Sequence, residues 1–206
     1  MSCPGLWLHG LQLNLSKCSV TNFVTKENFH CSPILCSDGE VLLVKSEVKI
    51  LGVTFADNFR WNSHVCNQLK KACKRIFIIR NLKRSGCDGK VIFNVPVYIA
   101  LIRSVLLYSY PCFCNAPKYL HDMLYKLEKR VSRIVSTDFV AEGPNILSVA
   151  DNLCASLFDS VVKADEHPLR ELFMVRQPTA RNPCVLRRPR MKTKRFSSSF
   201  IKFCPT

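Results

Sequence analysis

Acidic residues are scarce in this chain of 206 residues, which contains 15 Asp and Glu against 30 Lys and Arg. The resulting formal net charge of +15 attracts polyanions, of which nucleic acid is the commonest and an anionic membrane surface is the other candidate. Glycine is also rare, with 7 residues and no glycine-rich phosphate-binding loop. The first residues carry no basic stretch ahead of an apolar one, so we expect no secretory signal and a cytoplasmic or nuclear location.

The sequence also lacks cysteine and histidine pairs at the spacings that are typical of metal sites. The 12 cysteines form no Cys-x-x-Cys pair, and the 5 histidines form no His-x-x-x-His pair. We therefore expect reduced thiols in the core or on the surface, and no metal or other cofactor bound by this chain. Hydrophobic residues make up 48% of the sequence, which is enough for a folded core and excludes a disordered polar chain.

The most apolar stretch, residues 91–113, is long enough to span a membrane. However, Asn94 and Pro96 interrupt it, and Arg103 near its middle would cost roughly 3 kcal/mol in lipid. A buried core helix is therefore expected here, with no membrane contact. A membrane-associated basic protein built around this stretch is kept as an alternative.

Short β-branched runs in the first part of the chain predict a small antiparallel meander. The expected strands are residues 18–25, 41–44 and 48–55, with Asp57 and Asn58 as the turn that closes the sheet. The rest of the chain reads as helical up to about residue 166. We expect residues 1–57 and 58–166 to be separate parts.

Four helices are predicted in residues 58–166. The first is expected to run from a Ser63 cap to about Ser85, with Gly86 as the stop, and the second from Pro96 to about Tyr110. The third is expected to begin after an Asn115 cap and the fourth after Asn145. The apolar stripes are Val65, Leu69, Ala72, Ile76 and Ile79 in the first helix, Leu120, Leu124, Leu127, Val131 and Ile134 in the third, and Ile146, Ala150, Leu153, Leu157 and Val161 in the fourth.

Charge is distributed unevenly over these helices. The first helix carries seven bases and no acid, namely Lys70, Lys71, Lys74, Arg75, Arg80, Lys83 and Arg84. The third has a basic flank of Lys126, Lys129, Arg130 and Arg133, whereas the fourth is acidic. Residues 167–206 are basic and rich in proline, which predicts an extended tail. The expected fold class is α+β, mainly α: a small antiparallel meander, a bundle of about four helices and an extended basic tail.

An ordered series of motifs resembles the reverse transcriptases of LINE-type non-LTR retrotransposons. Residues 10–18, GLQLNLSKC, resemble the segment that follows the catalytic YxDD motif, and residues 48–53, VKILGV, resemble the family's "LGV" strand. Residues 59–65, FRWNSHV, resemble the "LxWxxHI" start of the thumb domain. Further matches to the thumb helices and the C-terminal "HPL…RTxRFxxSFI" pattern lie in residues 70–86, 98–108, 127–134 and 167–201.

The resemblance implies that residues 1–57 are the end of the palm with a primer-grip strand, that 58–166 are the thumb along the primer–template duplex, and that 167–206 are the tail. The candidate nucleic-acid-binding residues are Lys17, Leu51, Gly52, Lys70, Lys71, Lys74, Arg75, Lys83, Arg84, Arg103, Lys129 and Arg130. Lysine and arginine would contact phosphates without sequence preference. Lys17 either matches the lysine that this family places near the incoming nucleoside triphosphate or is simply a solvated side chain. Arg103 pairs either with a phosphate or with a helix carboxylate.

Polymerase chemistry requires carboxylates that hold two metal ions. The chain contains no Asp-Asp dipeptide, and its resemblance begins after the position of YxDD. We expect no enzymatic activity from the isolated chain, although the parent polymerase uses Mg²⁺. The expected partners are RNA or an RNA–DNA duplex, and other parts of a reverse transcriptase.

An active enzyme is the alternative. It would be either a reverse transcriptase or a protein like the N-terminal region of AlkB homologues, which residues 59–65 also resemble. The sequence has no His-x-Asp iron-binding motif to support oxidative demethylation.

Overall fold

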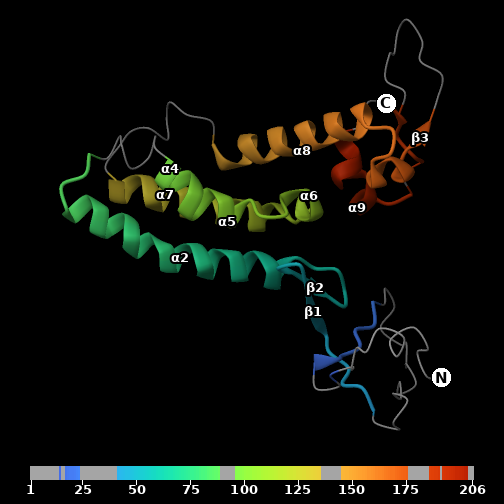
Figure 1. Cartoon of the computed structure of the whole chain (residues 1–206), viewed down its shortest axis with the longest axis horizontal. Helices are drawn as coiled ribbons and strands as arrows, with labels where there is room; N and C mark the ends of the chain where they lie inside the picture. The colour runs from blue at the N-terminus through green and yellow to red at the C-terminus, as the bar shows by residue number, and fades with distance from the viewer. Residues whose placement is uncertain are drawn as a thin grey trace, which may run out of the picture. The chain divides into compact units, whose positions relative to one another are not determined.

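The computed structural model describes residues 14, 17–23, 41–88, 96–135, 145–175, 186–190 and 192–203. The chain divides into two compact units, residues 1–64 and 65–206 (Figure 1). The boundary between these units lies inside a helix. The fold is α+β and mainly α, with a β-hairpin followed by about four helices, which confirms the predicted class.

The first unit contains the hairpin of β1 (Glu47–Ile50) and β2 (Val53–Ala56), which pair antiparallel. Leu51 and Gly52 form the two-residue turn, with φ angles of 47° and 83°. Positive φ at both central residues matches the twist of a hairpin, and glycine adopts it without steric cost. The predicted single strand over 48–55 is therefore wrong, because the chain reverses at Leu51–Gly52.

The other predicted strands of the meander contribute a β-bridge among the described residues. Val20 pairs with Val44 in parallel, through hydrogen bonds from Val20 N to Leu43 O (3.0 Å) and from Lys45 N to Val20 O (2.8 Å). Residues 24–40 lie outside the described part of the chain, so the full extent of the predicted strand 18–25 is not tested. Asp57 N donates to Ser46 O at 2.8 Å, which continues the pairing of the two strands, and Phe59 N donates to Ala56 O at 2.8 Å, which confirms the turn at Asp57 and Asn58.

Helix α2 (Asn62–Arg84) begins against this hairpin. Trp61 is buried beside Phe55, with ring centroids 5.7 Å apart, and the fully buried His64 accepts a hydrogen bond from Thr54 N at 3.2 Å. Ser63 was expected to cap the helix, but it lies inside the first turn, and its hydroxyl donates to the Glu47 carboxylate.

The C-terminal end of α2 agrees closely with the sequence. Gly86 has a φ of 83°, its N–H donates to Lys83 O at 3.1 Å, and Cys87 N donates to Leu82 O at 3.2 Å. This is the glycine-dependent helix stop known as the Schellman motif. The predicted stripe is buried at Val65, Ala72, Ile76 and Ile79, and half-buried at Leu69.

The second predicted helix is found as three contiguous elements: α4 (Pro96–Tyr98), a π-helical turn (Ile99–Arg103) and α5 (Ser104–Leu106). The start at Pro96 is confirmed, and Ser109, with a φ of 58°, lies close to the predicted end at about Tyr110. The short helix α6 (Tyr110–Phe113) follows. Within the described residues, no helix is both long and apolar enough to cross a membrane.

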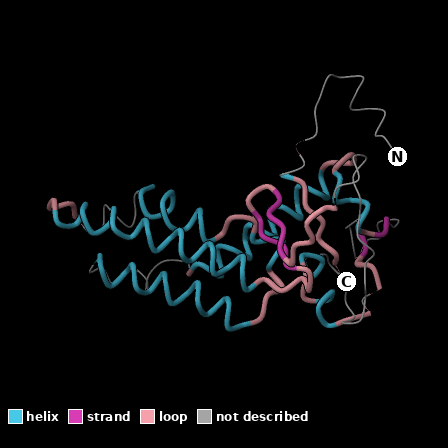
Figure 2. Tube along the Cα trace, turned by 90° about the horizontal axis from the view of Figure 1, so that it is seen from below, coloured by secondary structure: helices cyan, strands magenta, loops and turns pink. Residues whose placement is uncertain are grey.

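The third and fourth helices are α7 (Lys118–Val135) and α8 (Ile146–Lys163). In Figure 1, α2 and α8 lie on either side of a middle layer formed by α4–α6 and α7, and Figure 2 shows the same helices running lengthwise. Asn115 precedes α7 by more than one residue and so does not cap it, whereas Asn145 caps α8 by accepting from Ser148 N at 2.8 Å.

The apolar stripe of α7 is buried as predicted at Leu120, Leu124, Leu127 and Val131. That of α8 needs a correction. Leu153 is exposed, and Cys154 and Phe158 are buried in its place, together with Ile146, Ala150 and Val161. Three of the five predicted positions are thus buried, Leu157 is half-buried, and the buried face shifts by one residue only in the middle of the helix.

The C-terminal segment is more ordered than the predicted extended tail. Its described elements are a 3₁₀ turn (Pro168–Leu172), β3 (Met174–Val175), β4 (Leu186–Arg187), α9 (Lys194–Ser197) and a second 3₁₀ turn (Phe200–Phe203). Phe173, Leu186 and Ile201 pack with Phe158 and Val161 of α8 in one core cluster. These apolar side chains lie between the basic residues, and their burial favours folding onto α8.

Candidate nucleic-acid interface

The outer side of α2 carries a row of exposed bases, hereafter the α2 basic face: Lys70, Lys71, Lys74, Arg80 and Arg84. The opposite side of the helix is buried in the bundle. No acid occurs anywhere between Asn62 and Arg84. At 1.5 Å per residue, the row extends over about 21 Å. These five side chains are exposed, so their charges can meet phosphates.

Two predicted members of this surface lie elsewhere. Arg75 Nη1 donates to the carbonyl oxygen of Leu101 at 3.1 Å, and Lys83 Nζ donates to the carbonyl oxygen of Ile134 at 2.6 Å. Both side chains are half-buried. They join α2 to the π-helical turn and to the C-terminal end of α7, where a cation is favourable for the helix dipole.

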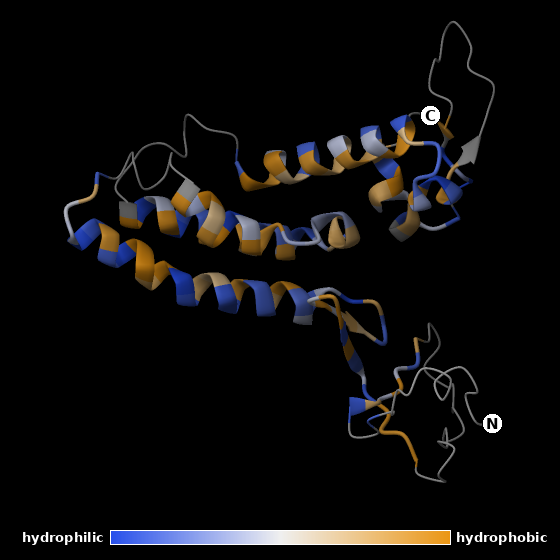
Figure 3. Cartoon of the chain, in the orientation of Figure 1, coloured by the Kyte–Doolittle hydropathy of each residue, from blue (hydrophilic) through white to orange (hydrophobic). Residues whose placement is uncertain are grey.

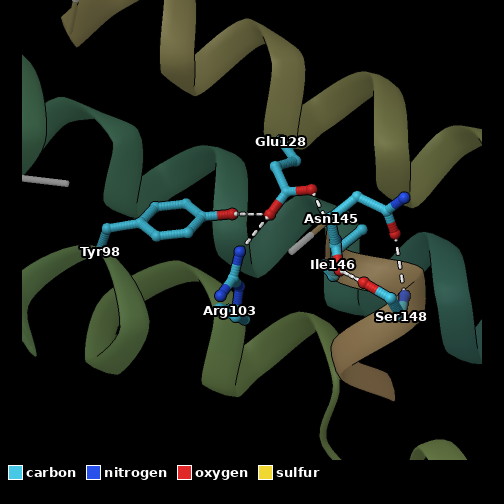
Figure 4. Close-up of polar contacts among 6 residues, drawn as sticks. All are labelled: Tyr98, Arg103, Glu128, Asn145, Ile146 and Ser148. Atoms are coloured by element: carbon cyan, nitrogen blue, oxygen red, sulfur yellow. Dashed lines mark hydrogen bonds and ion pairs between the residues drawn. The ribbon is translucent and has the colours of Figure 1, made fainter. Parts of the chain in front are cut away.

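Arg103 is also directed inward, and the choice left open by the sequence is resolved in favour of a carboxylate. Its Nη2 lies 2.7 Å from Glu128 Oε1, and the two side chains are 15% and 2% exposed. Tyr98 Oη donates to the same oxygen at 2.8 Å, and Ile146 N donates to Glu128 Oε2 at 2.8 Å (Figure 4). Hereafter these four residues are the Glu128 cluster.

The electrostatics of the Glu128 cluster favour this arrangement. Burial, and then the charge of Glu128, raise the pKa of the Tyr98 hydroxyl far above its usual range, so it remains a donor. Burial alone would lower the pKa of Arg103, but its hydrogen bond to Glu128 and the neighbouring charges raise it overall. The guanidinium also lies 5.2 Å from the centre of the Tyr98 ring.

The Glu128 cluster connects four elements of the bundle. Tyr98 and Arg103 come from α4 and the π-helical turn, Glu128 from α7, and Ile146 from the first turn of α8. The carboxylate therefore satisfies an otherwise unpaired N–H at the N-terminus of α8 and faces the positive end of its dipole. Both carboxylate oxygens have donors, which assigns Glu128 a structural role in positioning α8 rather than a chemical one.

The remaining candidates are divided between the two units. Lys129 and Arg130 are exposed on α7, with Lys126 and Arg133, and Lys129 Nζ lies 4.7 Å from the centre of the Tyr125 ring. In the first unit Lys17 is exposed, and Leu51 is 87% exposed at the tip of the hairpin beside the half-buried Gly52. Among the described candidates, the structure thus places Lys70, Lys71, Lys74 and Arg84 on the outer side of α2, and Lys129 and Arg130 on α7.

Sequence reasoning missed the role of Glu128 and Tyr98. A signal for Glu128 was present, because it follows Leu124 by four residues and precedes Val131 by three, which places it in the apolar stripe of α7. A lone acid at a core position requires buried partners.

Comparison with known proteins adds no assignment. No family model, no curated protein and no solved structure matches this chain. Among the residues that the structure describes, no group of three or more His, Cys, Asp or Glu is placed to hold a metal ion. The α2 basic face and the motifs in the sequence are therefore the features that indicate a function.

Proposed function

We propose that this chain binds the phosphate backbone of nucleic acid through the α2 basic face, as the thumb-like part of a LINE-type reverse transcriptase. The observation that carries this proposal is the 23-residue helix with exposed lysine and arginine along one side and no acid. Contacts of this kind neutralise phosphates and release counterions, and they carry no base information. The expected ligands are RNA and RNA–DNA duplexes, without sequence preference.

A merely solvated helix face would be arranged differently. Exposed helix surfaces usually place opposite charges four residues apart, which stabilises the helix by a few tenths of a kcal/mol per pair. Here Lys70 and Lys74 are like charges at that spacing, and so are Arg80 and Arg84. Among the described residues none of these four takes part in an ion pair. A bound polyanion would relieve this repulsion, which favours a ligand-binding role.

The hairpin tip fits the same proposal. A primer-grip-like element requires an exposed turn, and Leu51 at the tip of the β1–β2 hairpin is exposed. The described helices carry no membrane-spanning segment that would favour the membrane alternative. A cytoplasmic or nuclear location remains part of the proposal, because nucleic acid is found there.

Catalysis is assigned to other parts of the parent polymerase. The chain has no Asp-Asp dipeptide with which to bind the Mg²⁺ ions of nucleotide transfer, so the proposal includes no enzymatic activity for the isolated chain. A primer-extension assay with Mg²⁺ tests this directly. Incorporation of nucleotides by the purified chain would contradict it and would favour the active-enzyme alternative.

The salt dependence of binding tests the main proposal. On an RNA–DNA duplex, the logarithm of the affinity should fall with the logarithm of salt concentration by about 0.9 for each phosphate neutralised. The double variant Lys70→Gln with Lys74→Gln should weaken binding and reduce this slope by about 2. The matched control replaces Lys118 and Lys163, exposed lysines on α7 and α8, by Gln. Equal losses in both double variants would show that only net charge matters and would refute a defined interface.

A further inference from the structure

Large apolar side chains occur on the outside of α2, where the buried stripe does not extend. Phe77 is 62% exposed and Ile78 is 43% exposed. Figure 3 shows a hydrophobic stretch in α2 between more hydrophilic parts of the same helix. Single exposed apolar residues are common and require no explanation. The position of Phe77 within the α2 basic face is what makes it informative.

Phe77 lies at the centre of that face. It follows Lys74 and precedes Arg80 by three residues, and it is seven residues from both Lys70 and Arg84. At 3.6 residues per turn, all four basic residues project within about 60° of the direction of Phe77. An exposed aromatic ring is therefore bordered by cations on both sides along the helix axis.

The surroundings limit what can cover this ring. An amphipathic helix that binds a membrane surface needs a broad apolar face, but that of α2 is buried in the bundle at Val65, Ala72, Ile76 and Ile79. A partner made only of phosphates would leave Phe77 in water. A nucleic acid with accessible bases satisfies both parts of the surface, because its backbone meets the cations and a base meets the ring.

We propose that Phe77 stacks on an unpaired base while Lys70, Lys74, Arg80 and Arg84 bind phosphates of the same strand. The α2 basic face would then prefer single-stranded nucleic acid, or a strand end, over the interior of a duplex. This inference rests on the proposed function and specifies its ligand. Stacking on an aromatic ring contributes about 1–3 kcal/mol per base, which corresponds to about 5- to 150-fold in affinity.

The test compares two oligonucleotides with the same number of phosphates: a short oligothymidylate and its abasic counterpart. Phe77→Ala should lose about 5- to 150-fold in affinity for oligothymidylate, measured by fluorescence anisotropy, and should bind the abasic strand as the wild-type chain does. Phe77→Leu, which keeps an apolar side chain without a π face, should recover only part of the loss. Leu153→Ala on α8 is the control for removing an exposed hydrophobic residue, and should change neither affinity.

The outcomes separate this inference from the proposed function. Binding of both strands that is sensitive to salt but unaffected by Phe77→Ala would overturn stacking and leave the backbone-binding proposal intact. Equal losses on both strands would also overturn stacking, because the ring would then act without bases. Binding of the wild-type chain to neither strand nor the RNA–DNA duplex would overturn both proposals. Loss of binding by Phe77→Ala only to anionic phosphatidylserine vesicles would assign the ring to a membrane surface instead.

Discussion

The Glu128 cluster and the α2 basic face use the same residue types in opposite ways. Within the bundle, Arg103 pairs with Glu128, and Arg75 and Lys83 donate to backbone carbonyl oxygens. On the outer side of α2, Lys70 and Lys74 are exposed and make no ion pair to any described residue. The comparison shows that not all of the net charge of +15 lies where a ligand can reach it. Some of the basic side chains instead hold the helices together.

The difference also has an energetic side. Burying Arg103 with Glu128 carries a desolvation cost, which is offset by the ion pair and by the hydrogen bonds that the carboxylate accepts. That requirement makes the cluster sensitive to the loss of the Glu128 charge. The α2 basic face has no such internal requirement. Its residues can be changed with little effect on folding, which permits separate tests of the two regions.

The largest effect is expected in the cluster itself. Glu128→Gln should destabilise the fold by about 3–5 kcal/mol, because it leaves the Arg103 charge buried without its counter-charge. The amide group would also direct an N–H toward one of the three donors, Tyr98 Oη, Arg103 Nη2 or Ile146 N. Urea unfolding followed by circular dichroism measures the loss.

Two further variants serve as controls for the Glu128→Gln prediction. Glu166→Gln removes an exposed acid and should change the stability by less than about 0.5 kcal/mol. Adding Arg103→Met to Glu128→Gln should recover part of the loss, since the uncompensated charge is then removed as well. Additive losses in the double variant would show that the two side chains do not depend on each other.

A smaller effect is expected next to the cluster, at the cap of α8. Asn145 accepts from Ser148 N at 2.8 Å, and Asn145→Ala should cost about 1 kcal/mol. The control is Asn152→Ala, an exposed position inside the same helix, which should be neutral or slightly stabilising because alanine is the better helix former. Thermal melting distinguishes them. A similar change in melting temperature for both variants would argue that the cap contributes nothing specific.

The sequence predicted α2 well because two independent signals agree there. The apolar spacing from Val65 to Ile79 fixes its buried side, and Gly86 fixes its end. The extent of the next helix, from Pro96 to about Tyr110, was also predicted, but its internal geometry was not. Apolar residues occur on most of its sides, so their periodicity contains no information about the π-helical turn or about α6.

Tertiary contacts account for the other failures. Phe173, Leu186 and Ile201 are far apart in a basic, proline-rich segment, so no local pattern predicts that they meet on α8. The Glu128 cluster is similar, because its members belong to helices whose proximity the sequence does not encode locally. By contrast, the exposed bases of the α2 basic face were predicted correctly, since surface position follows from helical spacing alone.

The neighbours Lys83 and Arg84 allow the most direct comparison between an inward and an outward base of α2. Lys83 donates to Ile134 O and Arg84 is exposed, although both belong to the last turn of α2. Lys83→Met should reduce the stability by about 0.3–1 kcal/mol, the usual range for a cation at a helix C-terminus, and leave binding almost unchanged. Arg84→Met should leave the stability unchanged and lower the salt slope of duplex binding by about 0.9.

Urea unfolding and anisotropy titrations on the same two variants decide the matter. If Lys83→Met weakens binding as much as Arg84→Met does, the inward and outward bases are not functionally distinct. The proposed boundary of the α2 basic face would then have to include Lys83.

The smallest effect concerns a half-buried histidine on α7. Partial burial, and then the charge of Lys202, lower the pKa of His121 below its usual value of 6.5, against the opposing effects of the Phe113 backbone and then of Asp151 and Asp122. Its Nδ1 lies 3.5 Å from Tyr110 Oη, and its Nε2 has no hydrogen-bond partner among the described residues. Because the unfolded chain takes up the proton first as the pH falls, this contribution to stability is present above about pH 6.5 and is lost below it.

His121→Asn should therefore reduce the fall in melting temperature that occurs when the pH is lowered from about 7.5 to about 5.5. The reduction should be small, because His121 is one of several residues that titrate in this range. The exposed bases of α2 offer the contrasting result, since lysine and arginine remain charged throughout this range. Lys70→Gln with Lys74→Gln should have the same pH profile of stability as the wild-type chain. A pH profile unchanged by His121→Asn would show that protonation of this ring is accommodated in the folded bundle, and that the paired interior tolerates a new charge as readily as the outer face of α2.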